Sequence, residues 1–174
     1  MKRTSFPAML AVFALLVPGT ALAQPSPAAH TEAMKKLGFL AGNWKGQGWI
    51  QFGPGKRERF EGSEKVRFKL GGTLLYLEGR HFEKNKPVHE AVGIFSFDPA
   101  SGDYRFHSWL SNGMSRVCDA RLKDGELVWF YQDPRSKRHI RFTISVEDGT
   151  WHEVGESSAD KKTWHQFFEM TLQK

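Results

Sequence analysis

Short apolar runs alternate with turn-forming residues over most of this chain. From Trp44 onward, runs rich in Val, Ile, Phe, Trp and Tyr are separated by turn signals such as Gly71-Gly72, Asn112-Gly113, Asp124-Gly125 and Asp148-Gly149. Nine such turns separate ten runs, and no helical period of apolar residues interrupts them. This pattern predicts an all-β fold, an up-and-down antiparallel sheet of about ten strands. Because an open sheet leaves unpaired edges, we expect it to close into a barrel.

The segment ahead of the strands carries two further signals. Apolar residues recur along one face of Thr31–Leu40, which predicts a short helix before the first strand. Residues 24–30 are rich in Pro and Ala, so we expect a linker there. The predicted barrel domain, with its helix, therefore covers residues 31–174.

Residues 1–23 have the features of a signal peptide. Lys2 and Arg3 give a basic start, residues 9–17 are apolar, and Ala21-Leu22-Ala23 is a small-x-small cleavage site. The apolar run is shorter than the roughly 18 residues that span a bilayer, so we expect no transmembrane segment. The sequence thus predicts cleavage near Ala23 and a periplasmic or secreted protein.

Composition narrows the class of protein. The chain has 174 residues, of which 40% are hydrophobic and 25% are charged, and it contains one Cys. This suits one globular domain and excludes a disulfide framework or a cysteine-based zinc site. The net charge is +6, and the predicted signal peptide accounts for two of the bases. The densest basic runs, 56–59 and 135–139, lie beside turns and match no nucleic-acid motif, so we expect no nucleic-acid partner.

Tight turns also predict which residues face each other across a hairpin. They place His81 opposite Glu90 and His107 opposite Cys118. The face that carries these residues is mostly apolar, but it holds too many polar groups for a dry core, because each unpaired buried polar group is costly. We therefore expect an interior cavity that holds a ligand. The candidate ligand-binding residues on this face are Glu64, His81, Glu90, Arg105, His107, Trp109, Arg116, Cys118, Trp129 and Tyr131.

Three aromatic residues fall on the opposite face in this register, namely Tyr76, Phe95 and Phe106. Either they form an exposed patch for a partner subunit, which predicts a homodimer, or the register changes at the loop Asp98–Asp103. The two readings differ by a shift of one residue.

The start of the predicted barrel resembles a known group of proteins. Residues 37–48 read LGFLAGNWKGQG, with Gly42-x-Trp44 at the head of the first strand, and Phe95–Tyr104 is similar to a "YDPxTGxY" hairpin. These elements resemble the lipocalin-like barrels, in particular a bacterial lipocalin-like family of unknown function and the related nitrobindin-type haem barrels. The resemblance implies a β-barrel whose closed end is sealed by Trp44.

The first function that these residues suggest is the binding of a small hydrophobic or anionic amphipathic molecule. Arg105, Arg116 and Tyr131 lie on three consecutive predicted strands and resemble the carboxylate clamp of fatty-acid-binding barrels. Each guanidinium can donate two parallel hydrogen bonds to a carboxylate. The alternative is an internal network in which interior glutamates, Glu153 among them, neutralise these arginines.

Two other functions stay open. The nitrobindin resemblance implies an axial His on a late strand, and His165 lies in that region, although the predicted register turns it outward. An isomerase or cyclase could use Glu64, His81 and Glu90 as acids and bases, while His107 beside Cys118 offers a base and a nucleophile. No hydrolase signature accompanies these residues. The expected function is therefore binding, with no catalytic residue, metal or cofactor assigned, and with haem as the alternative.

Overall fold

The computed structural model describes residues 27–174 of the chain. The predicted signal peptide and the first part of the predicted linker lie outside the described residues. No helix among the described residues is long and apolar enough to cross a membrane.

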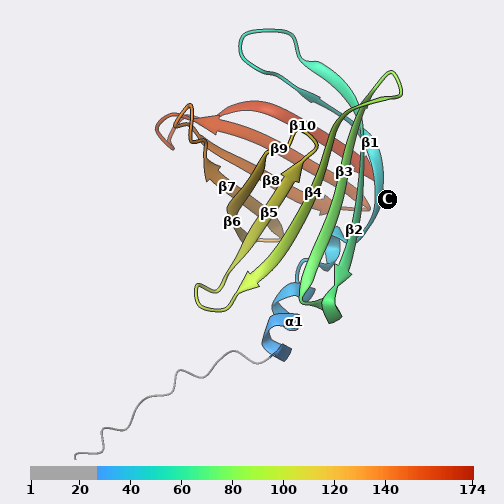
Figure 1. Ribbon diagram of the computed structural model, residues 1–174, viewed down its shortest axis with the longest axis vertical. Helices are drawn as coiled ribbons and strands as arrows, with labels where there is room; N and C mark the ends of the chain where they lie inside the picture. Colours follow the sequence, from blue (N-terminus) through green and yellow to red (C-terminus); the bar gives the residue numbers. More distant parts are fainter. Residues whose placement is uncertain (1–26) are drawn as a thin grey trace, which may run out of the picture.

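Ten antiparallel strands form one closed barrel, which confirms the predicted fold class (Figure 1). Each strand pairs with its neighbour in the chain, and β1 closes the barrel by pairing with β10. The strands are β1 (Gly42–Ile50), β2 (Glu58–Lys69), β3 (Leu74–Glu83), β4 (Lys86–Asp98), β5 (Asp103–Leu110), β6 (Ser115–Lys123), β7 (Glu126–Gln132), β8 (His139–Glu147), β9 (Thr150–Ser158) and β10 (His165–Gln173). A short 3₁₀ turn, η2 (Leu70–Gly72), links β2 to β3.

A helix closes one end of the barrel. The helix α1 (Pro27–Lys35) begins four residues before the predicted start at Thr31, and the chain then forms a separate 3₁₀ turn, η1 (Gly38–Leu40). The apolar face expected for this segment is confirmed, because Met34, Leu37 and Leu40 are fully buried. Burial of three large apolar side chains in the barrel end supplies much of the stability that so short a helix lacks alone.

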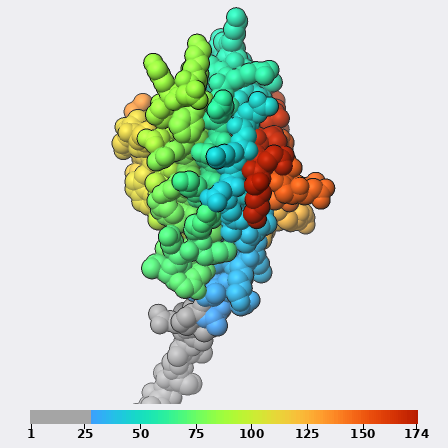
Figure 2. All heavy atoms as spheres, turned by 90° about the vertical axis from the view of Figure 1, so that its right-hand side faces the viewer, coloured from blue at the N-terminus to red at the C-terminus, as the bar shows by residue number. Residues whose placement is uncertain are grey.

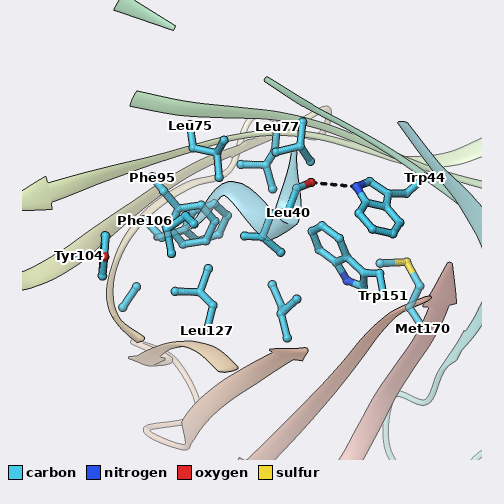
Figure 3. Close-up of a cluster of buried hydrophobic side chains, with 14 of the residues drawn as sticks. Leu40, Trp44, Leu75, Leu77, Phe95, Tyr104, Phe106, Leu127, Trp151 and Met170 are labelled. Carbon is cyan, nitrogen blue, oxygen red and sulfur yellow. Dashed lines mark hydrogen bonds between the residues drawn. The ribbon is translucent and has the colours of Figure 1, made fainter. Parts of the chain in front are cut away.

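Two side-chain hydrogen bonds fix this closed end. The indole Nε1 of Trp44 donates to the carbonyl oxygen of Leu40 over 2.8 Å (Figure 3). The Tyr104 hydroxyl donates to the carbonyl oxygen of Ala33, also over 2.8 Å. Trp44 also packs edge-on against Trp151, with ring centroids 5.6 Å apart. Trp44 therefore seals the base of the barrel, as the resemblance implies.

Most of the predicted register is confirmed. Phe68 pairs with Leu75 across the turn at Gly71-Gly72, and Ala120 pairs with Trp129 across Asp124-Gly125. The interior faces of β2, β3 and β6 to β9 are therefore those that the sequence predicts.

The predicted register is wrong between β3 and β4. The turn is formed by Lys84 and Asn85, which both have positive φ, and a bulge follows between His81 and Phe82. His81 consequently pairs with His89 and not with Glu90. A shift of one residue reverses the face of every side chain on β4, so Glu90 lies on the outside.

A second shift, between β5 and β6, restores the register. Leu110 donates a backbone hydrogen bond to Met114 and thereby encloses three turn residues, where a two-residue turn is predicted. The predicted inward placement of Arg105, His107 and Trp109 is therefore wrong. Cys118 faces inward as predicted, but its partner is Phe106.

The aromatic residues that the predicted register leaves outside are mostly core residues. Phe95 and Phe106 are buried and stack with ring centroids 4.3 Å apart. Gly93 leaves the room for the Phe106 ring, since a Cβ at position 93 would lie 2.6 Å from it. Only Tyr76 faces outward, where its hydroxyl hydrogen-bonds to Glu78. Of the two readings, the outer patch does not form, which removes the reason to expect a homodimer through it. The register does change, but at the β3–β4 and β5–β6 turns and not at Asp98–Asp103, where Phe97 pairs with Tyr104.

Candidate functional site

A cavity of about 1150 Å³ occupies the barrel interior and opens at the end opposite α1. The loops around its opening are those between β1 and β2, β3 and β4, β5 and β6, β7 and β8, and β9 and β10 (Figure 1). Small-molecule pockets are concave and mostly apolar with a few converging polar groups. The lining of this cavity fits that description, because aromatic side chains make its walls and charged groups lie at two levels.

Aromatic rings line one side of the cavity in a continuous stack. Trp129 lies parallel to Phe142 with centroids 4.1 Å apart, and Phe142 meets Phe168 edge-on at 5.5 Å. Phe168 in turn stacks with Phe60 at 5.7 Å, and Phe60 stacks with His81 at 4.0 Å. A glycine leaves the room for this packing, as a Cβ at position 155 would lie 2.7 Å from Phe142. These rings provide an apolar surface for a ligand body.

Arg116 and Tyr131 form a polar pair near the opening. Arg116 Nη1 donates to the Tyr131 hydroxyl over 2.8 Å, and the guanidinium lies over the Tyr131 ring at 4.6 Å from its centroid. Asp133 lies 3.8 Å from the other terminal nitrogen of Arg116. The sequence places Arg116 and Tyr131 on the same interior face of neighbouring strands, and in the structure the two side chains are in contact.

The second arginine at this level is Arg138 and not Arg105. Arg138 is half-buried, lines the cavity and donates from Nη2 to the Ser157 hydroxyl over 3.1 Å. Sequence reasoning missed it because it lies in the loop before β8, where solvated charge is the usual explanation. Arg105 lies outside the barrel, where it forms ion pairs with Asp119 and, at 3.6 Å, with Asp98.

Two glutamates lie deeper in the cavity. Glu64 packs against Gly79, where a Cβ would lie 2.5 Å from its carboxylate, and its half-buried side chain lines the cavity. Glu153 is buried and accepts a hydrogen bond from the Trp151 indole over 3.3 Å. Burial, with the charge of Glu153, raises the pKa of Glu64 to about 8, and burial raises the pKa of Glu153 to about 7.

The alternative arrangement, an internal network between glutamates and arginines, is absent from the described residues. Glu64 and Glu153 form no ion pair there, and Glu90 pairs outside the barrel with Arg80 over 3.1 Å. Since neither interior carboxyl has a cation beside it, the two groups can hold and release protons near neutral pH. This is the clearest chemical capacity of the deep part of the cavity.

His81 and His89 form an uncharged pair on the cavity wall. Their rings lie 4.9 Å apart. Burial and the proximity of His89 lower the pKa of His81 to about 4, and burial also lowers the pKa of His89. Both imidazoles are therefore neutral at physiological pH.

The remaining candidates divide between the barrel exterior and the core. His107 and Trp109 lie on the outer face of β5, as their pairing with Val117 and Ser115 shows. Cys118 is buried, and that burial raises the pKa of its thiol to about 11, so the thiol is protonated at neutral pH. The predicted cluster of Glu64, His81 and Glu90 is likewise divided, because Glu90 lies outside.

His165 faces the opposite way from its prediction. A bulge between Gln166 and Phe168 pairs His165 with the inward-facing Ser157, and His165 lines the cavity opening. Within the described part of the chain, no group of three or more His, Cys, Asp or Glu side chains is arranged to hold a metal ion.

Comparison with known proteins identifies a family but no activity. Residues 29–174 match the family described as "Protein of unknown function (DUF1579)". No protein with a curated description matches the sequence. The crystal structure of Rv2717c from M. tuberculosis is similar in fold, with a TM-score of 0.59 and 14% sequence identity over 82% of this chain and 96% of that chain. At that identity the similarity concerns the fold alone.

Proposed function

The chain belongs to the DUF1579 family of proteins of unknown function, and we propose that its barrel binds a small amphipathic molecule. The apolar body of this ligand lies among the rings of Trp129, Phe142 and Phe168. Its anionic group lies near the opening, within reach of Arg116 and Arg138. The observation that carries the proposal is the aromatic-walled cavity of about 1150 Å³ with Arg116 and Tyr131 at one level.

The charges near the opening support an anionic group there. Arg116 is only partly neutralised, because Asp133 lies 3.8 Å away and also accepts hydrogen bonds from Ser136. Arg138 has hydroxyl and carbonyl partners from Ser157 and forms no ion pair with an acid among residues 27–174. Two guanidinium groups with spare N–H donors are suited to a carboxylate, a sulfonate or a phosphate.

Titration with cis-parinaric acid, a fluorescent fatty acid, tests the proposal. We expect saturable binding, and we expect Arg116→Gln to weaken it at least about tenfold, which corresponds to about 1.4 kcal/mol. Arg105→Gln is the matched control, since it removes the same charge from the barrel exterior and should leave the affinity unchanged. Equal affinities for the two variants would contradict the proposed placement of the anionic group.

Haem binding is a second candidate, favoured by the position of His165. A haem iron can be ligated by an imidazole nitrogen, and the His165 side chain lines the cavity opening. Haem titration should produce a shifted Soret band that His165→Ala abolishes. His139→Ala, which removes an outward imidazole at the start of β8, should retain it. A spectrum identical to that of free haem would eliminate this candidate.

A further inference from the structure

The two ends of the barrel carry opposite charge. The open rim consists of the five loops around the cavity opening, residues 51–59, 83–89, 110–116, 133–138 and 159–165, and it contains eleven Lys and Arg but four Asp and Glu. The closed end, residues 27–42, 69–73, 98–103, 123–126, 147–150 and 173–174, contains five basic and seven acidic residues. The basic excess of the chain is therefore concentrated around the mouth of the cavity.

Three of the rim lysines lie at turn positions with an unusual backbone conformation. Lys84, Lys137 and Lys161 occupy turn positions with φ of 50°, 60° and 61°. Gly and Asn are favoured in this left-handed conformation, and a long side chain there is uncommon. At the closed end the corresponding positions are held by Leu70, Asp124 and Asp148, none of which is basic. No rim lysine forms an ion pair among the described residues, so these charges face solvent.

Apolar side chains project from the same rim. Phe52, Val88 and Met114 are 75%, 58% and 41% exposed, and they come from three different loops. All three also line the cavity opening. Figure 2 shows the β1–β2 loop and the β3–β4 turn extending beyond the barrel at the end opposite α1. The rim thus combines exposed apolar groups with positive charge, a combination that membrane-surface segments share.

We propose that the open rim docks on an anionic lipid bilayer, with the cavity mouth facing the membrane. The lysines attract acidic headgroups, while Phe52, Val88 and Met114 enter the boundary between headgroups and acyl chains. An amphipathic ligand could then pass between the bilayer and the cavity without crossing water. A nucleic acid would satisfy the charges, but it would leave Val88 and Met114 without an apolar environment.

Co-sedimentation with vesicles tests this surface. The chain from Gln24 is used, because residues 27–174 form the complete barrel and the apolar run at 9–17 would bind lipid by itself. We expect binding to vesicles of phosphatidylcholine mixed with phosphatidylglycerol, weak binding to phosphatidylcholine alone, and loss of binding at high salt. Replacement of Lys84, Lys137 and Lys161 by Gln should lower the partition coefficient at least about tenfold.

Matched variants at the closed end distinguish docking through the rim from nonspecific binding of the protein to lipid. Replacement of Lys36, Lys69 and Lys123 by Gln removes the same charge and should have little effect. Phe52→Ser should weaken binding severalfold, whereas Leu70→Ser, at a side chain that is 74% exposed at the closed end, should not. Circular dichroism checks that each variant is folded.

Three results would overturn the docking surface. One is equal binding to both kinds of vesicle, and another is equal loss in the rim and closed-end variants. The third is vesicle binding that is unchanged in the Phe52→Ser variant and that a DNA duplex inhibits by competition. None of these results depends on a ligand in the cavity, so titration of the same variants with cis-parinaric acid still tests the proposed function separately.

Discussion

Glu64 is an ionisable residue held inside the barrel without a compensating cation, and its protonation links stability to pH. Its pKa is about 8 in the folded protein against an ordinary value of 4.5. The folded state therefore binds more protons than the unfolded state between these values, and the free energy of unfolding falls as pH rises through that window. Glu153 acts in the same direction, with a folded pKa of about 7.

Glu64→Gln should remove most of this dependence. Between pH 6 and pH 9 we expect the unaltered protein to lose about 2–3 kcal/mol more stability than the variant, from a slope of about 1.4 kcal/mol per pH unit up to the folded pKa. The neutral histidines act in the opposite direction, because the lowered pKa of His81 costs stability only as pH falls from 6.5 toward 4. Above pH 6.5 the carboxyl effect is therefore measured almost alone.

Urea unfolding at a series of pH values measures this difference. Glu90→Gln is the control, since Glu90 lies outside and pairs with Arg80. Parallel pH profiles for the unaltered protein and Glu64→Gln would show that Glu64 is ionised in the folded state at neutral pH, and they would contradict the raised pKa of its carboxyl group.

At the scale of strands and turns, the fold is predictable because ten short runs and nine turns are local signals. Which face a strand buries is less predictable, because it depends on turn length to a single residue. The turn at Asn112-Gly113 contains three residues, since the Asn112 side chain accepts a hydrogen bond from Met114 N and lengthens it. The turn before β4 forms one residue earlier than the sequence predicts, with Lys84 in a conformation that is unusual for it.

The alternation of aromatic and polar residues along β5 indicates which face of the strand is buried, and turn lengths alone predict that face wrongly. Tyr104 and Phe106 alternate with Arg105 and His107, and a strand with one buried face places the aromatic pair inside. The half of the candidate site on β6 and β7, with Arg116, is predictable because its hairpin has a clear Asp-Gly turn. Arg138 and His165 are not predictable in this way, because a loop and a bulge orient them.

At the scale of the whole molecule, the barrel has one sealed end and one open end. Met34, Leu37 and Trp44 seal the first, and the basic rim surrounds the second. Access to the interior is therefore directional, and any molecule that enters must pass the ring of positive charge. Along this axis the rim lysines come first, followed by the two levels of charged groups inside the cavity, with Arg116 near the opening and Glu64 deeper.

The measurement that tests the central claim most directly is native mass spectrometry of the intact protein after incubation with cis-parinaric acid, compared with a variant whose cavity is filled. Ser108 faces inward and lines the cavity, so Ser108→Trp places an indole in the ligand space without adding a charge. The unaltered protein should carry one bound fatty acid, and Ser108→Trp, folded by circular dichroism, should carry none. Equal occupancy of the two proteins would show that the ligand binds outside the barrel and would contradict the proposed function.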